Sequence, residues 1–254
     1  MTAAMTPALE TQGLAKNFGA LQVARDITFT LPVGARHALI GPNGAGKTTF
    51  INLLTGVLRP NAGHIRLGGS DVTGLGQAAR VKRGIARTFQ ITSLFNGLTV
   101  ADNVALAVAE RRGVAWGMLR PATANREIRD EAVALLESLQ IGGTAHRPVR
   151  ELPYGQRRLV EIALALALKP RVLLLDEPAA GIPTHESGII LEVIATLPAD
   201  IAILIIEHDM DVVFRFAERI TVLVSGAILV EGAPAEIADD PRVREVYLGE
   251  SVHV

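Results

Sequence analysis

The stretch GPNGAGKT, residues 41–48, constrains the fold of this chain more than any other feature of its sequence. It has the complete pattern G-x-x-x-x-G-K-T and stands between an apolar strand, HALI, and a helix, TTFINLLTG. Its glycines let the backbone curl around phosphates, while successive N–H groups and the helix start supply donors. The alternative is a glycine turn with a solvated lysine, but the context favours binding of a nucleoside triphosphate. The residues expected to contact it are Gly41, Pro42, Asn43, Gly44, Ala45, Gly46, Lys47, Thr48 and Thr49.

Some side chains near this loop carry more specific expectations. Lys47 is long enough to reach the outer phosphates, and the Thr48 hydroxyl is a ligand for magnesium. A metal-holding carboxylate is expected where a sheet strand ends, and VLLLDEP (172–178) places Asp176 after four apolar residues. Glu177 follows, and it is a candidate to accept a proton from the water that attacks the γ-phosphate. Adjacent acids often merely solvate a loop, but beside a phosphate-binding loop the catalytic interpretation is favoured.

Charge and composition argue against several classes of protein. The 254 residues include 25 basic and 26 acidic ones, for a net charge of -1, and no marked cluster of Lys and Arg. Binding to nucleic acid or anionic lipid is therefore not expected. The absence of cysteine excludes disulfides and thiolate metal sites and fits a reducing compartment.

The sequence contains no segment that is expected to enter a membrane. The first residues lack the basic head and apolar core of a secretory signal. The longest apolar runs, such as Ile201 to Ile206, are far shorter than the ~18 residues that span a bilayer. We therefore expect a cytoplasmic protein whose membrane role, if it has one, needs another chain.

Residue periodicity indicates a mixture of strands and helices. Strands are expected at 9–18, 26–32, 35–41, 171–176 and 201–207, and helices at 125–140 and 154–168. The last two strands are apolar throughout, and each follows a helical segment, which is typical of neighbouring buried strands in a parallel sheet. ITVLVSGAILVEG (220–232) predicts a hairpin that turns at Ser225–Gly226, and short helices are expected to begin near Pro234 and Pro241.

Five motifs occur along the chain in the order GPNGAGKT, ARTFQ (86–90), LPYGQ (152–156), VLLLDEP and IIEHDM (205–210). In order and spacing they resemble those of the nucleotide-binding subunit of an ATP-binding cassette (ABC) transporter, and the resemblance covers essentially the whole chain. It implies binding of ATP and Mg²⁺, ATP hydrolysis coupled to transmembrane transport, and a position on the cytoplasmic face of the inner or plasma membrane. The implied partners are a second ATPase subunit, identical or different, membrane permease subunits and, indirectly, a substrate-binding protein.

The resemblance assigns roles to residues that would otherwise read as ordinary. Gln90 would sense magnesium and the attacking water while touching the membrane subunit, so that Thr48, Gln90 and Asp176 form the expected metal set. His208 would contact the γ-phosphate and orient Glu177 or the water. Phe18 would stack on adenine, where the family most often has Tyr, although a core position is the alternative. The signature motif would complete the ATP site of another subunit through Leu152, Pro153, Tyr154, Gly155 and Gln156.

The signature motif departs from the usual LSGGQ. Pro153 and Tyr154 replace the usual Ser and first Gly, so a hydroxyl near the γ-phosphate is missing and a bulky ring is added. Gly155 still permits close backbone approach, and backbone donors are expected to carry more of the contact. Pro183 stands where the family normally has Asp, which removes a side-chain contact across the dimer.

Within the family, the sequences of three segments are informative: LPYGQRRLVEIALALA, LLDEPAAG and the ending VYLGE. They resemble most the ATPase subunits of branched-chain amino acid importers and of their relatives for urea or amides. Because the family's receptor and membrane chains select the substrate, the sequence indicates a transporter class rather than a ligand.

The expected fold is α/β: a P-loop NTPase core with an N-terminal antiparallel β subdomain and an inserted α-helical subdomain, the ABC ATPase fold. Residues 1–254 are expected to form one domain, with a catalytic lobe at about 1–90 and 159–254 and a helical subdomain at about 91–158. Two other functions compete with transport. A soluble cassette protein of a nucleic-acid, ribosome or cluster-assembly complex often has coiled-coil inserts or basic surfaces, which this sequence lacks. A catalytically silent binding module would be expected to lose Lys47 or Glu177.

Overall fold

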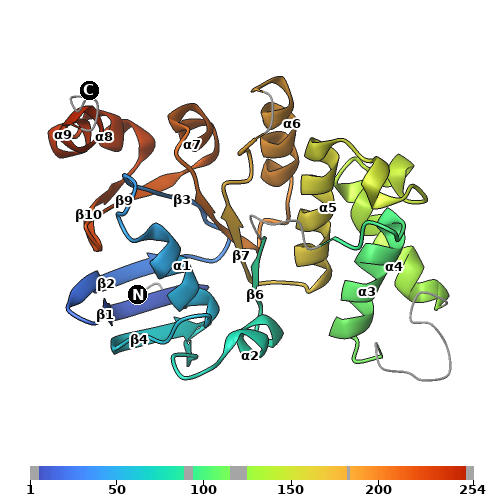
Figure 1. The fold of residues 1–254 in the computed structure, drawn as a ribbon, viewed down its shortest axis with the longest axis horizontal. Helices are drawn as coiled ribbons and strands as arrows, with labels where there is room; N and C mark the ends of the chain where they lie inside the picture. The colour runs from blue at the N-terminus through green and yellow to red at the C-terminus, as the bar shows by residue number, and fades with distance from the viewer. Residues whose placement is uncertain (1–5, 89–93, 115–124, 182–183, 250–254) are drawn as a thin grey trace, which may run out of the picture. The chain divides into compact units, whose positions relative to one another are not determined.

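The structure, a computed structural model, describes residues 6–88, 94–114, 125–181 and 184–249 (Figure 1). Contacts within the chain define two compact units. The first comprises Met1–Ile85, Arg171–Glu177 and Pro198–Val254, and the second comprises Ala86–Pro170 and Pro178–Leu197. Helix α5 (Tyr154–Ala167), which lies wholly in the second unit, spans the point at which the sequence places the end of the helical subdomain. The functional division of the domain therefore stays a prediction.

An antiparallel sheet occupies the N-terminal part of the first unit, as expected. Its strand order is β2-β1-β4-β5, with β1 at Leu9–Phe18, β2 at Leu21–Leu31, β4 at Ala62–Leu67 and β5 at Ser70–Asp71. Strand β2 begins five residues earlier than the expected position 26, because Phe18 pairs with Leu21 around a tight turn at Gly19. Asp26, at φ 49°, interrupts the alternation of apolar residues there. The sequence pattern therefore does not indicate the first half of the strand.

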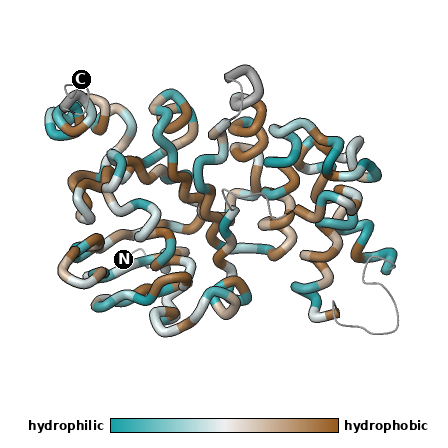
Figure 2. The backbone as a smooth tube through the Cα atoms, viewed as in Figure 1, coloured by the Kyte–Doolittle hydropathy of each residue, from teal (hydrophilic) through white to brown (hydrophobic). Residues whose placement is uncertain are grey.

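A second sheet forms the centre of the first unit. The strands of this sheet that lie wholly in the first unit run in the order β10-β9-β3-β8-β7, with bounds Ala227–Gly232, Arg219–Val224, Arg36–Ile40, Ala202–Ile206 and Val172–Asp176. Strands β7 and β8 are parallel neighbours whose residues are all buried, which confirms the prediction from the two apolar runs. Hydrophobic residues follow the strands of this sheet in Figure 2. Strand β6 (Ile85–Arg87) begins at Ile85, the last residue of the first segment of this unit, and its other residues belong to the second unit.

The predicted hairpin near the C-terminus is also confirmed. Strands β9 and β10 pair antiparallel from Val224 and Ala227 outward. The two turn residues, Ser225 and Gly226, have φ of 48° and 82°, as a two-residue type I′ turn requires.

Five helices of the first unit are described: α1 (Lys47–Thr55), α2 (Gln77–Lys82), α7 (Met210–Phe216), α8 (Pro234–Asp239) and α9 (Pro241–Gly249). The last two begin at the expected prolines. The fully buried Arg80 donates hydrogen bonds from Nη1 to the carbonyls of Leu53 and Leu54, at 2.6 and 2.8 Å. Because these carbonyls lie in the last turn of the helix, where backbone acceptors lack the usual helical donors, the cation caps the C-terminal end of α1.

The second unit is helical in its described part. It contains α3 (Val100–Arg111), α4 (Arg126–Ser138), α5 and α6 (Thr184–Ala195), with short 3-10 turns at Gly142–Thr144 and Val149–Glu151. Thr99 and Asn125 cap α3 and α4 by accepting hydrogen bonds from the N–H groups of Asp102 and Glu127. The expected helices at 125–140 and 154–168 are confirmed within two residues at each end.

A buried histidine lies on the strand that precedes the phosphate-binding loop. His37 is fully buried, and its Nε2 lies 2.8 Å from the hydroxyl of Thr221, which itself donates to Glu231 at 3.0 Å. Nε2 therefore carries the proton, and Nδ1 has no hydrogen-bond partner in the described part of the chain. Since protonation would place a second N–H in this buried site, burial lowers the pKa of His37 to about 4.

We expect His37 to make the fold acid-sensitive. The unfolded chain takes up a proton at pH 6.5 and the folded chain only at about pH 4, so the free energy of unfolding falls as pH drops through this window. The loss approaches about 3 kcal/mol. Urea unfolding at several pH values measures it, and His37→Gln should flatten this dependence, whereas the exposed His64→Gln should not. An unchanged pH dependence in His37→Gln would contradict the assignment.

Candidate functional site

The residues predicted to bind nucleotide follow the carboxyl ends of neighbouring parallel strands. Strand β8 pairs with β3 on one side and β7 on the other, with Ile206 opposite both Leu39 and Asp176. The phosphate-binding loop follows β3, Glu177 follows β7, and His208 follows β8 after one residue. The fold therefore brings these predicted residues to one edge of the sheet, where open α/β sheets bind ligands.

Glycines of the loop 41–46 stand where a side chain would collide with backbone. A Cβ on Gly41 would lie 2.1 Å from the carbonyl oxygen of Leu223, and one on Gly46 would lie 2.8 Å from that of Val23. Both glycines have positive φ, 154° and 101°. The N–H of Gly226 donates to the carbonyl of Ala45 at 2.8 Å and ties the loop to the β9–β10 hairpin. The loop is thus held tightly from behind, and its conformation requires glycine.

The start of α1 is arranged to receive an anion. Gly46 is the N-cap and provides no side-chain cap, and the first turn contains no acidic residue. The N–H groups at this end and the positive pole of the helix dipole are consequently suited to phosphate. Lys47 Nζ donates to the carbonyls of Gly41 and Pro42, at 2.5 and 3.0 Å, so its ammonium group crosses the loop. Thr48 and Thr49 lie in the same helical turn.

The two acids after the apolar strand differ in their surroundings. Asp176 ends β7 and is buried, with 6% of its surface exposed. Glu177 has φ 47°, and its N–H donates to the carbonyl of Ile206 at 2.9 Å. A left-handed backbone at a non-glycine residue costs about 1–2 kcal/mol and is found most often at functional sites. The side chain of Glu177 is 30% exposed, which leaves it accessible to solvent.

His208 lies beside the candidate base. Its Nδ1 is 3.8 Å from Oε1 of Glu177 and 3.9 Å from Oε2 of Glu207. These distances are too long for hydrogen bonds but bring a largely exposed imidazole next to two carboxylates. Our reading of the sequence missed Glu207, whose side chain is only 1% exposed. The signal was present, because this acid directly follows an apolar strand, as Glu177 does.

Phe18 lies on the hairpin whose second strand runs past the phosphate-binding loop. It ends β1 and pairs with Leu21 at the start of β2, and 48% of its surface is exposed. Further along β2, the N–H of Arg25 donates to the carbonyl of Gly226 at 2.7 Å, next to the loop. Lys16 Nζ lies 5.4 Å from the centre of the Phe18 ring. The ring is therefore not part of the core, and its stacking on a base stays a prediction.

The signature residues lie in the second unit, at the start of α5. Pro153 is the N-cap without a side-chain cap, Leu152 and Gly155 are buried, and Tyr154 is 52% exposed. Gln156 lies in the first turn of the helix, and its Oε1 is buried without a hydrogen-bond partner in the described part of the chain. The helix start thus presents backbone donors and a tyrosine ring. Gln90 and Pro183 lie outside the described residues, so the expectations placed on them stay predictions.

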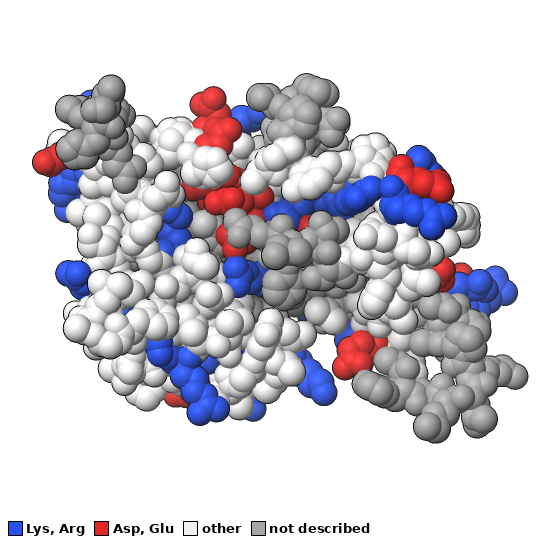
Figure 3. Space-filling view, in the orientation of Figure 1, with Lys and Arg blue, Asp and Glu red and all other residues white. Residues whose placement is uncertain are grey.

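Among the residues that the structure describes, no helix is long and apolar enough to cross a membrane. Within the same ranges, no group of three or more His, Asp and Glu side chains is placed to hold a metal ion. Basic side chains occur at several separate places on the face shown in Figure 3, and acidic side chains lie near some of them.

Comparison with known proteins places the chain in a family. The family model described as ABC transporter matches residues 24–180, and that of the branched-chain amino acid ATP-binding cassette transporter matches residues 227–253. The chain belongs to the ABC transporter family. As a member of this family it binds ATP and is an ATPase.

Individual relatives agree with this assignment. The branched-chain amino acid transport ATP-binding protein BraF of Pseudomonas aeruginosa is 38% identical over 96% of this chain and 99% of its own length. The lipopolysaccharide export ATP-binding protein LptB of Acidithiobacillus ferridurans is also 38% identical, over 98% of this chain and 100% of LptB. The ADP conformation of MJ1267, an ATP-binding cassette of an ABC transporter, superimposes with a TM-score of 0.85 at 30% identity, over 96% and 99% of the two chains.

Proposed function

We propose that this protein is the ATP-hydrolysing subunit of a membrane importer for branched-chain amino acids or related small polar solutes. The observation that carries the proposal is the edge of the central sheet, where the phosphate-binding loop, Asp176, Glu177 and His208 follow three adjacent parallel strands. The match of residues 227–253 to the branched-chain amino acid family model supports import of such solutes. Identity alone does not separate this class from lipopolysaccharide export, because BraF and LptB are equally similar to the chain.

The predicted site residues of the first unit have separate parts in the proposed reaction. The loop amides and Lys47 hold the triphosphate, and Phe18 stacks on the adenine ring. Glu177 accepts a proton from the attacking water, and His208, 3.8 Å away, orients that carboxylate. Removal of the proton makes the water a stronger nucleophile toward the γ-phosphate.

A magnesium ion fits the donors present. The buried carboxylate of Asp176 and the hydroxyl of Thr48 are hard oxygen ligands, and Mg²⁺ usually takes only one or two protein ligands beside phosphate and water. We propose that these two residues and Gln90 hold the ion, which would neutralise charge on the phosphates.

The remaining parts of the proposal concern partners. The start of α5, with Leu152 to Gln156, completes the ATP site of a second cassette subunit, identical or different. Gln90 touches a permease subunit, and a substrate-binding protein supplies the solute. The protein therefore works at the cytoplasmic face of the membrane, attached through its permeases.

Solute uptake by a reconstituted complex tests the proposal. The chain is assembled in liposomes with the permeases, the second cassette and the binding protein encoded beside it, with ATP inside. We expect uptake of labelled leucine that depends on ATP and on the binding protein. Labelled urea serves as the competing solute, and uptake of urea alone would redirect the proposal to the urea and amide relatives.

A further inference from the structure

Glu177 is the last residue of a segment of the first unit, and Pro178 is the first residue of a segment of the second. The chain therefore passes between the two compact units at the peptide bond that follows the candidate base. On the side of the first unit, the N–H of Glu177 is held by the carbonyl of Ile206 at 2.9 Å. Any displacement of Pro178 must be absorbed by the backbone of Glu177, which already has the unusual φ of 47°.

Within the second unit, α5 is bonded to the segment that follows Glu177. Arg158 Nε donates to the carbonyl of Pro178 at 3.4 Å. One turn earlier on the same helical face, the Tyr154 ring lies near Gly181, where an added Cβ would be 3.7 Å from the tyrosine hydroxyl. The first two turns of the helix that carries the signature motif thus lie beside residues 178–181, and Arg158 supplies the hydrogen bond between them.

A second partner of Arg158, the carboxylate of Glu161, fixes the position of its guanidinium. Its Nη1 lies 2.7 Å from Oε2 of Glu161, and the two side chains are only 7% and 10% exposed. A buried ion pair of this kind restricts the rotamer of the arginine, so Nε is directed steadily at Pro178. Lysine in this position would have one ammonium group for both partners and would lack the separate Nε donor.

Proline makes the link between α5 and Glu177 stiff. Its ring fixes φ near −65°, so a movement of the Pro178 carbonyl is taken up by ψ of Pro178 and by the backbone torsions of Glu177. Proline also restricts the conformation of the residue before it. The part of an α5 shift that reaches φ of Glu177 turns its Cα–Cβ bond and so changes the direction of its carboxylate.

We propose that Arg158 is a positioning residue for hydrolysis: it connects the signature helix to Glu177 through the carbonyl of Pro178. This inference rests on the proposed role of Glu177 as base. When α5 engages the nucleotide of a second subunit, Arg158 and Pro178 set the carboxylate of its own chain for catalysis. Hydrolysis in one site thereby depends on completion of the other.

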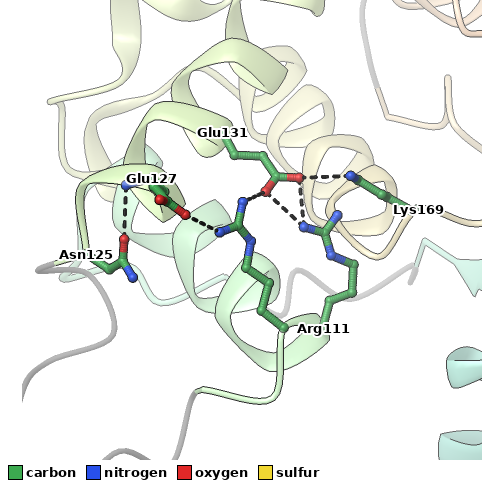
Figure 4. A network of polar contacts seen from close by, with 6 residues as sticks. Arg111, Asn125, Glu127, Glu131 and Lys169 are labelled. Carbon is green, nitrogen blue, oxygen red and sulfur yellow. Dashed lines mark hydrogen bonds and ion pairs between the residues drawn. The ribbon is translucent and has the colours of Figure 1, made fainter.

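The test compares three variants of the full chain in the reconstituted complex. Arg158→Met removes both contacts, and Arg158→Lys keeps a cation for Glu161 but loses the donor to Pro178. Arg111→Met is the matched control, because Arg111 forms a comparable pair with Glu131 of α4, at 2.7 Å, in the same unit (Figure 4). That pair also joins Arg112 and Lys169, and it lies on α3 and α4, away from residues 178–181 in the sequence. For each variant kcat, the Kd for ATP and the melting temperature are measured.

We expect kcat to fall by about 10- to 100-fold in both Arg158 variants, as small misplacements of a catalytic group do, with the Kd for ATP unchanged. Arg111→Met should lower the melting temperature and leave kcat at the wild-type value. Arg158→Lys keeps the test decisive if the methionine variant does not fold. Wild-type kcat in Arg158→Lys, or an equal loss in Arg111→Met, would overturn the inference.

Glu177→Gln, run in parallel, separates the two levels of the proposal. If this variant keeps its turnover, the role of Glu177 as base is wrong, and the inference on Arg158 falls with it. If Glu177→Gln loses turnover while Arg158→Lys keeps it, only the positioning role is wrong.

Discussion

Replacing Glu177 by glutamine lowers kcat for ATP hydrolysis by about 10²- to 10⁴-fold, the usual cost of losing a general base. Glutamine has nearly the same shape but does not accept a proton from water. Binding of ATP should be retained, because the phosphate contacts come from the loop after β3 and from the start of α1. Steady-state phosphate release measures turnover, and calorimetric titration measures binding.

Glu218→Gln is the control for this experiment. Glu218 is an exposed carboxylate of the same unit that stands directly before β9, and its N–H donates to the carbonyl of Arg36 at 2.8 Å, at the amino end of β3. The control should hydrolyse ATP at the wild-type rate. Unchanged hydrolysis in Glu177→Gln would remove this residue from the base role, and a loss of ATP binding would show that it acts on the nucleotide instead.

Replacing Gly155 by aspartate should abolish ATP-dependent pairing of cassettes while ATP binding by the isolated chain is kept. The new carboxylate would stand at the helix start of α5, where a phosphate of the partner's nucleotide is expected, and the two negative charges repel. The chain's own phosphate-binding loop lies in the first unit and is unaffected. Light scattering in a Glu177→Gln background measures pairing, because hydrolysis then does not dissolve the dimer.

The control for an added negative charge on the second unit is Gly143→Asp, and the melting temperature of Gly155→Asp shows whether this variant is folded. Gly143 is an exposed glycine of the second unit, and a Cβ added to it would meet no atom within 4 Å. Pairing is measured with the chain alone and with the chain mixed with the second cassette that is encoded beside it. Both are needed because the natural partner is either a second copy of this chain or that other cassette. Intact pairing in Gly155→Asp, or loss of ATP binding by its monomer, would contradict the role assigned to LPYGQ.

Much of the site was predictable because its residues follow apolar strands. A run such as VLLLD is buried on both faces of a parallel sheet, so its composition predicts the strand, and the polar residue that ends it is directed to the carboxyl edge. The loop after HALI adds glycines that the backbone requires, as the close approach of Gly41 to Leu223 demonstrates. Local pattern therefore indicated both the elements and the chemistry.

Other features depend on contacts between distant segments and were not predictable. The buried His37 owes its low pKa mainly to desolvation where it packs against Phe29; the charge of Glu231 raises the pKa and that of Arg219 lowers it, and all three residues lie on other strands. The alternation of polarity in β2 breaks between Val23 and Asp26, yet pairing with β1 makes residues 21–26 part of the strand. The contact of Arg158 with Pro178 joins residues 20 positions apart, and no periodicity signals it.

Leucine uptake in the reconstituted vesicles tests most directly whether hydrolysis at this site drives solute import. We expect ATP-dependent uptake with the wild-type chain, and uptake near the level without ATP when every copy carries Glu177→Gln. Equal uptake with the wild-type chain and with Glu177→Gln, or no ATP-dependent uptake of either leucine or urea by a complex that hydrolyses ATP, would contradict it.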